Sequence, residues 1–417
     1  MRTTYPLDCT ALMLPYAFSK TRPPVFRLTV VLTEKIDPCI LKQAVQDLVA
    51  RFPTLYTRLR RGFVWDCLEH LPAPNIVAPD NEPCRSFAYK DTLLRVLYRE
   101  NQLSIECCHL TADGMAAVVY LNSLTARYLE LRGHVIEKSP SVLHCEDNPT
   151  QEELTDGYRA VYEKPQKKQV PLEGGRAYTY NTRQKEKHRQ ITCVQLPIDA
   201  LKAMLNEKYD GCTITEYLTA VFACALLAQR ENTPKQKRPI RLAMPSNLRQ
   251  FWQLGTLRNF AAATQLTFLP QQTNCDFLEI LAHVRVETRN NLTREKTQDF
   301  INQTVSYLNM LNFMPGFVKR IIVSAGALLL GRVVWPFTSS ISNLGYIQLP
   351  PSLAKHIESY TLVMGGFDLA KILCGAAGVN NVMTVAFSTV NETAVRDFCI
   401  DFYQNDGLPV QVTTRDF

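Results

Sequence analysis

The chain has 417 residues, of which 46% are hydrophobic and 20% are charged, and this composition excludes a disordered, collagen-like or disulfide-stapled protein. This length exceeds what one hydrophobic core usually organises, so we expect two domains with a cleft between them. The formal net charge of +7 is spread along the chain rather than collected in one tail, which argues against nucleic-acid binding.

The N-terminal residues contain no apolar run behind a basic start, so we expect no signal peptide or anchor and a cytoplasmic location. The 13 cysteines lack CxxC spacing, which favours reduced thiols and predicts no metal site. The most apolar stretch, Ile321 to Leu330, is far shorter than the ~20 residues that a membrane span needs. It predicts a buried or cleft-lining helix, with peripheral membrane contact as the alternative.

The first 140 residues begin with an alternating apolar pattern from Phe26 to Leu32, which predicts a strand with one buried face. Asp37 as N-cap and Pro38 as first helical residue predict a helix that ends before Pro53. Short strands are then expected at residues 55–60, 63–68, 93–99 and 103–108. The last two form a hairpin, and a helix is expected over residues 114–131.

From about Lys138 to Gln190, the residues Pro, Gly, Gln, Lys and Glu predominate, which is typical of a connection. We therefore expect an N-terminal lobe over 1–140, a connection over 141–190 and a C-terminal lobe over 191–417. In the C-terminal lobe, strands are expected at 191–196, 240–244, 264–269, 360–364 and 382–388, and helices at 197–209, 213–229, 276–290 and 392–404. Helices mixed with hairpin-linked strands indicate α+β sandwich lobes.

The sharpest chemical signal is the segment LSIECCHLTADG, in which a histidine directly follows a predicted strand and an aspartate comes four residues later. A residue at the end of a strand is held by the sheet while it faces a cleft. A neutral imidazole suits removal of a hydroxyl proton at neutral pH, because its ordinary pKa is about 6.5. We therefore predict that His109 is a general base, and that Asp113 and Gly114 form the turn into the next helix.

The segment CHLTADG resembles the HHxxxDG motif of condensation domains and CoA-dependent acyltransferases, the superfamily with the chloramphenicol acetyltransferase-like fold. Tyr128 follows Asp113 after fourteen intervening residues, and this spacing resembles the HxxxD-x14-Y pattern of polyketide-associated acyltransferases and alcohol acetyltransferases. MPSNLRQFWQLGTLRNF, at 244–260, and SISNLGYIQLP, at 340–350, resemble blocks of the bacterial alcohol acetyltransferase branch. The chain is thus most similar to the alcohol acetyltransferase and polyketide-associated branch.

The resemblance implies two chloramphenicol acetyltransferase-like lobes that form a pseudo-dimer around a central tunnel, in a monomeric protein. It implies that His109 deprotonates an acceptor hydroxyl, which attacks the thioester of an acyl-CoA through a tetrahedral intermediate. Acyl-CoA, with an acetyl or other short to medium chain, is then a co-substrate, the acceptor is a small or lipidic alcohol, and no bound cofactor is expected. Two alternatives stay open: ester or amide formation from a carrier-protein thioester, and a non-catalytic member of the fold.

The resemblance gives Asp113 a structural role. In this superfamily the motif aspartate forms an interior ion pair with an arginine from the other half of the chain, and the pair fixes the shape of the active-site turn. Arg249 is the expected partner, and Arg258 is the second choice. The alternative is a solvent-exposed aspartate that only caps the following helix.

Polar residues elsewhere are candidates for substrate contacts. Asn343 and Asn247 are expected to orient the thioester or to donate a hydrogen bond to the oxyanion. Ser342 and Tyr128 are further candidates for substrate binding. The alternative for Asn343 is turn geometry, which the nearby Gly345 favours.

One departure from the motif is Cys108, which stands where the first histidine of the doublet is found. Many HxxxD proteins lack that histidine, so we expect activity to survive. The change makes kinship with peptide-forming condensation domains less favoured, and it keeps the non-catalytic alternative open.

Overall fold

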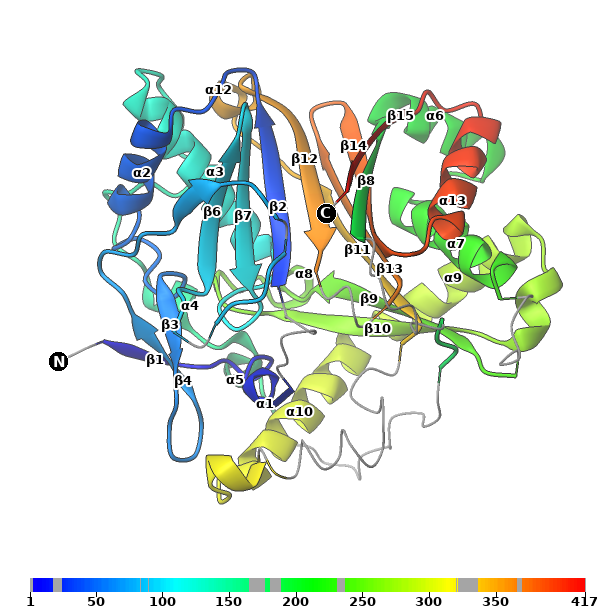
Figure 1. Cartoon of the computed structure of the whole chain (residues 1–417). Coiled ribbons are helices and arrows are strands. Elements are labelled where there is room, and N and C mark those ends of the chain that lie inside the picture. Colours follow the sequence, from blue (N-terminus) through cyan, green and yellow to red (C-terminus); the bar gives the residue numbers. More distant parts are fainter. Residues whose placement is uncertain are drawn as a thin grey trace.

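Figure 1 shows the protein as a computed structural model, with two large sheets and helices packed against each. The structure describes residues 3–17, 25–82, 84–88, 90–164, 177–180, 189–230, 237–319, 321, 337–365 and 370–416. Mixed sheets with helices on their faces confirm the expected α+β architecture. Within the described residues, no helix has both the length and the apolar character that crossing a bilayer requires.

A five-stranded sheet forms the core of the N-terminal half. Its strands, in spatial order, are β12 (Ile357–Met364), β2 (Val25–Leu32), β7 (Gln102–Cys108), β6 (Leu94–Arg99) and β5 (Val77–Pro79). Helices α2 (Pro38–Asp47) and α3 (Gly114–Leu131) pack against it (Figure 1). The α2 helix begins where the sequence predicts, because the Asp37 carboxylate accepts hydrogen bonds from the backbone N–H groups of Cys39 and Ile40.

A seven-stranded sheet forms the core of the C-terminal half. Its strands, in spatial order, are β10 (Ala261–Phe268), β9 (Ile240–Asn247), β11 (Ser339–Tyr346), β13 (Ile372–Val379), β14 (Val382–Val390), β8 (Arg189–Pro197) and β15 (Gln411–Asp416). The helices that cover it are α6 (Ile198–Lys208), α7 (Ile214–Ala228), α9 (Phe277–Asn291) and α13 (Ala394–Asn405). The apolar side chains between this sheet and its helices form a second large core.

Smaller elements lie around the two sheets. A three-stranded sheet is built from β1 (Thr4–Pro6), β4 (Cys67–His70) and β3 (Thr57–Arg60). The short helices are α1 (Leu14–Ala17), α4 (Gln151–Leu154), α5 (Gly157–Ala160), α8 (Arg249–Trp252), α12 (Pro351–Ala354) and the 3-10 helix η1 (Pro270–Asn274). The long α10 helix (Arg294–Leu311) lies below both sheets in the view of Figure 1.

The two halves are joined through β12. This strand follows β11 in the chain, but it pairs antiparallel with β2 and so completes the N-terminal sheet. At Gly375 in β13 a Cβ would collide with the carbonyl oxygen of Leu362 in β12, so glycine permits the close approach of the two sheets. The junction between the halves is therefore a packed contact of backbones.

Most sequence predictions for individual elements are confirmed, including the strand at β7, the hairpin to β6 and the full extent of α3. The α2 helix ends at Asp47 rather than just before Pro53, and the residues between form turns. The predicted helix at Ile321 to Leu330 lies outside the described residues except for Ile321.

Candidate active site

His109 lies in a tight turn between the end of β7 and the start of α3. The turn is closed by Thr111, whose backbone N–H and hydroxyl each donate to the carbonyl oxygen of Cys108 over 2.9 Å. The half-buried His109 imidazole packs against Phe26, with ring centroids 4.5 Å apart. A ring held by the sheet on one side and by the turn on the other is fixed in position before any substrate arrives.

The surroundings of His109 favour its neutral form. Burial lowers the pKa of the imidazole below its ordinary value, while the Asp113 carboxylate and the Asn259 side chain act in the opposite direction. The net direction is downward. A neutral imidazole at neutral pH can accept a proton, which is the property that a general base requires.

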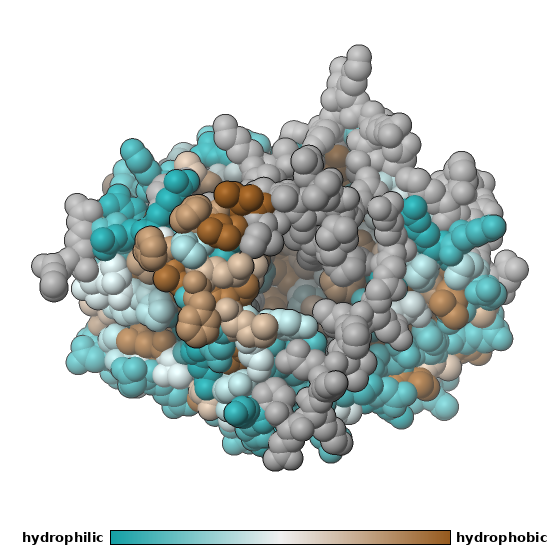
Figure 2. All heavy atoms as spheres, turned by 90° about the horizontal axis from the view of Figure 1, so that it is seen from below, coloured by the Kyte–Doolittle hydropathy of each residue, from teal (hydrophilic) through white to brown (hydrophobic). Residues whose placement is uncertain are grey.

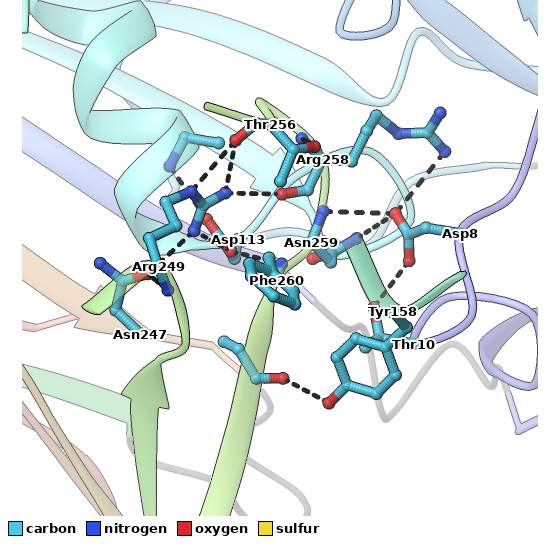
Figure 3. Close-up of polar contacts among 12 residues, drawn as sticks. Asp8, Thr10, Asp113, Tyr158, Asn247, Arg249, Thr256, Arg258, Asn259 and Phe260 are labelled. Atoms are coloured by element: carbon cyan, nitrogen blue, oxygen red, sulfur yellow. Dashed lines mark hydrogen bonds and ion pairs between the residues drawn. The ribbon is translucent and has the colours of Figure 1, made fainter. Parts of the chain in front are cut away.

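Asp113 is buried and uses both carboxylate oxygens (Figure 3). Oδ1 accepts from the backbone N–H of Ala116 over 2.9 Å and so caps α3. Oδ2 accepts from Nη1 of Arg249 over 2.8 Å and from the backbone N–H of Phe260 over 2.7 Å. Asp113 therefore serves both as the helix cap and as a member of a buried ion pair with Arg249.

Arg249 comes from α8 and connects the turn at residues 109–114, called the motif turn below, to the loop that follows α8 (Figure 3). Its Nε and Nη2 donate to the carbonyl oxygen of Thr256, and Nη2 also donates to that of Arg258 over 2.8 Å. The Oδ1 atom of Asn247 accepts from Nη1 over 3.1 Å. The planar guanidinium thus makes hydrogen bonds in several directions at once, as its fork of donors allows.

Arg258, the second candidate for the partner of Asp113, pairs with a different carboxylate. Its Nη2 donates to the carbonyl oxygen of Pro6 and lies 3.6 Å from Oδ2 of Asp8, and both charged side chains are almost fully buried. Burial raises the pKa of Asp8, while the charge of Arg258 opposes that shift. This second ion pair joins the N-terminal segment to the same loop.

Asn259 links this second pair to the catalytic candidate. Its Nδ2 donates to Oδ2 of Asp8 and to the carbonyl oxygen of His109, each over 2.9 Å. Sequence reasoning assigned no role to Asn259 or Asp8. The signal for Asn259 was its place in the TLRNF block, whereas nothing near Asp8 marks it.

The SNLG segment lies at the end of β11 and packs against the motif turn. A Cβ on Gly114 would lie only 2.9 Å from Cδ2 of Leu344, so glycine makes room for this contact. Asn343 donates through Nδ2 to the Thr215 hydroxyl over 2.9 Å, and its Oδ1 accepts from the backbone N–H of Gly345, whose φ is +72°. These are the contacts of a turn, which is the alternative that the sequence left open for Asn343. Ser342 precedes it and is half-buried.

Tyr128, a candidate for substrate binding, lies near the end of α3 that is far from His109. Its side chain is buried at the end of α3 away from His109, and fourteen residues of helix correspond to roughly 21 Å. The hydroxyl accepts from the backbone N–H of Asp37 over 2.9 Å and from Arg132 over 3.2 Å. Tyr128 therefore fastens α3 to the start of α2.

Neither cysteine before His109 has the character of a nucleophile. Cys107 and Cys108 are both fully buried, and burial raises the pKa of each thiol to about 12. Cys108 packs in a separate apolar cluster that includes Tyr158 and Phe260. Thiols in this setting stay protonated at neutral pH.

The face seen in Figure 2 has a hollow near its centre. Exposed apolar side chains gather beside it, over the loop between β3 and β4 and the end of α10. They are Phe63, Met310, Phe313 and Phe317. The backbone N–H of Gly316 donates to the carbonyl oxygen of Phe63, which holds these two segments together.

No protein-family model and no curated protein sequence matches the chain. Solved structures do. Structurally similar chains include F. sporotrichioides TRI101 complexed with coenzyme A and T-2, with a TM-score of 0.62 at 9% identity over 98% of this chain and 99% of that one. The condensation domain of the Monacolin K polyketide synthase MokA has a TM-score of 0.54 at 12% identity over 97% and 96%. Polyketide synthase associated protein 5 from Mycobacterium tuberculosis has a TM-score of 0.54 at 15% identity, over 95% of this chain and 96% of that one.

The chain has the two-lobed, chloramphenicol acetyltransferase-like fold of condensation domains and CoA-dependent acyltransferases. The resemblance read from the HxxxDG segment is confirmed at the level of this fold. Because the identities are low, the likeness carries the architecture, and the chemistry must be argued from the residues of this chain.

Proposed function

We propose that the protein is an acyltransferase that moves an acyl group from acyl-CoA to an alcohol hydroxyl, with His109 as general base. The observation that carries the proposal is the His109 turn. His109 has a neutral imidazole at the end of β7, and its backbone carbonyl oxygen accepts a hydrogen bond from the Asn259 side chain. The residue lies beside the buried Asp113–Arg249 pair. A structurally similar protein, TRI101, was solved with coenzyme A bound.

The proposed reaction needs one base and no covalent intermediate. His109 accepts the proton of the hydroxyl as its oxygen attacks the thioester carbonyl, giving a tetrahedral oxyanion. The intermediate collapses by breaking the C–S bond, and the proton passes from the imidazolium to the departing thiolate. Cys107 and Cys108 do not form an acyl-enzyme, because their buried thiols have pKa values raised to about 12.

Asp113 and Arg249 act in this proposal as positioning residues. Oδ2 of Asp113 holds the backbone of Phe260, and the preceding residue, Asn259, holds the carbonyl oxygen of His109. Asn343 is not assigned to the oxyanion, because its Nδ2 donates to the Thr215 hydroxyl and its Oδ1 accepts from the backbone N–H of Gly345. Asn247 points its oxygen at Arg249 and is kept as a candidate donor to the thioester through Nδ2.

The acceptor in this proposal is an alcohol with an apolar body. The hollow in Figure 2 has exposed apolar surface beside it. Apolar borders of this kind are typical of sites that take apolar ligands. We propose that CoA and the acceptor reach His109 from opposite openings of a tunnel between the two halves.

The test is release of free thiol from acetyl-CoA in the presence of short and long alcohols. The wild type should turn over, and His109→Ala should lower the rate by about 10²- to 10⁴-fold. His70→Asn, a histidine whose ring contacts the carbonyl oxygen of Pro53 away from this turn, should keep the wild-type rate.

The outcomes separate the alternatives. Equal rates for the wild type and His109→Ala would refute the general-base role. Turnover only with an acyl group on a carrier protein would assign the protein to condensation-type chemistry. No turnover with either donor would favour a non-catalytic member of the fold.

A further inference from the structure

A cluster of potential metal ligands lies far from the His109 turn, at the opposite end of α3. Glu34 follows β2, His134 follows α3 and His356 precedes β12. One ring nitrogen of each histidine and one carboxylate oxygen of Glu34 all lie within 4.8 Å of one another. Since α3 has 18 residues, roughly 27 Å of helix separates this cluster from Asp113.

The cluster contains an unsatisfied nitrogen. Nε2 of His356 is buried and has no hydrogen-bond partner. The two imidazole rings have centroids 4.3 Å apart, and Nε2 of His134 lies 4.0 Å from Oε1 of Glu34. A buried polar atom without a partner is costly, and a bound metal ion would satisfy it.

We propose that Glu34, His134 and His356 form a binding site for a divalent transition metal, with Zn²⁺ as the best match. Two imidazoles and one carboxylate are a common ligand set for zinc, which takes nitrogen and oxygen ligands at about 2.0–2.2 Å. The three ligand atoms lie within 4.8 Å of one another and need to move closer together to reach a tetrahedral arrangement, with water as the fourth ligand.

The charged groups around the cluster are compatible with such a site. Nη2 of Arg132 lies 2.7 Å from Oε2 of Glu34, which leaves Oε1, the oxygen nearer His134, for the metal. The positive charges of Arg132 and Lys355 weaken binding by repulsion, so a moderate affinity is expected.

The site would act as a structural clamp. Its ligands come from three segments that are about 100 and 222 residues apart in the chain, and β12 belongs to the C-terminal half while it completes the N-terminal sheet. The backbone N–H of Thr33 already donates to the carbonyl oxygen of His356. A metal ion would add a link from His134 after α3 to the paired strands β2 and β12, independently of the proposed transferase chemistry.

The test uses untagged full-length protein that has been stripped with a chelator and is then titrated with Zn²⁺ in a calorimeter. The wild type should bind one Zn²⁺ per chain at this site, and its thermal midpoint should rise with added Zn²⁺. His356→Ala and Glu34→Gln should each weaken Zn²⁺ binding by about 100-fold or more, because loss of a direct ligand costs at least as much as loss of its supporting contacts. Glu358→Gln, an exposed carboxylate close by in β12, is the matched control and should bind like the wild type.

Co²⁺ distinguishes this site from binding by cysteines. Co²⁺ held by nitrogen and oxygen ligands lacks the intense near-ultraviolet band of a cobalt–thiolate bond, so its absence in the wild type supports the proposal. Glu34 is largely exposed, so Glu34→Gln is expected to fold normally even where His356→Ala does not. Equal Zn²⁺ affinity in the wild type and Glu34→Gln, or a thiolate band that persists in both, would overturn the proposal whatever the outcome for His109.

Discussion

Replacing Arg249 with methionine removes the guanidinium that faces Asp113 and leaves a side chain of similar length. The Asp113 side chain is 6% exposed and that of Arg249 is 17% exposed, with 2.8 Å between Nη1 and Oδ2. Removing one partner of a buried pair typically costs 3–5 kcal/mol. Asp113 keeps the backbone donors of Ala116 and Phe260, so we expect the lower end, about 3 kcal/mol of unfolding free energy.

Urea unfolding measures this cost, provided that the slope of free energy against urea is unchanged. Arg58→Met is the control, because the Arg58 side chain in its ion pair with Glu69 is 31% exposed. This variant should lose less than about 1 kcal/mol of unfolding free energy. The double variant Arg249→Met with Asp113→Asn should cost less than the sum of its single changes. A loss below about 1 kcal/mol for Arg249→Met, or strict additivity of the two costs, would refute the assignment of a buried, coupled pair.

Three further outcomes follow from the same geometry. Because burial lowers the pKa of His109, kcat/KM should rise with pH through a midpoint below the ordinary imidazole pKa of about 6.5 and stay level at higher pH. Asp113→Asn removes a charge that raises this pKa, so it should move the midpoint lower still. A midpoint above about 6.5 in the wild type would contradict the neutral-base argument. Asn259→Ala removes the side-chain donor to the buried Oδ2 of Asp8 and frees the carbonyl oxygen of His109, so it should cost about 1–3 kcal/mol in urea unfolding and lower kcat more than it raises KM. Asn148→Ala, at an exposed position, should change neither. Tyr128→Phe should lower the free energy of unfolding by about 1 kcal/mol and leave KM for both substrates unchanged, whereas an altered KM would support the substrate-binding role expected from the sequence.

Elements with strong local signals were predictable from sequence. The Asp37–Pro38 start of α2 and the Gly114 start of α3 are set by capping within a few residues of each helix end. The β13 strand was missed because Ile372 to Val379 is buried throughout, so its apolar residues do not alternate, and its glycines resemble a loop. The α10 helix was missed because its many polar residues weaken the helical apolar pattern.

The site was predictable only where a motif marked it. His109, Asp113 and Arg249 lie in segments with recognisable spacing, and the structure brings these three together. The contact of Asn259 with Asp8 joins residues 251 positions apart, and no local pattern reports such a contact. The metal-ligand cluster was missed for the same reason, since its histidines have no zinc-like spacing in the sequence.

The composition of residues 141–190 predicts a plain connection, yet residues 151–157 of this segment contact both the N-terminal half and the loop at 256–260. Glu153 forms a two-point ion pair with Arg51 of the N-terminal half, and its carbonyl oxygen accepts from the backbone N–H of Leu257. A Cβ at Gly157 would overlap the ring of Phe260, the residue whose backbone N–H donates to Asp113. The connection therefore packs against the 256–260 loop, and Arg249 donates hydrogen bonds to the same loop and to Asp113 in the motif turn. The position of His109 thus depends on three parts of the chain at once: the motif itself, the segment from Arg249 to Phe260, and the connection.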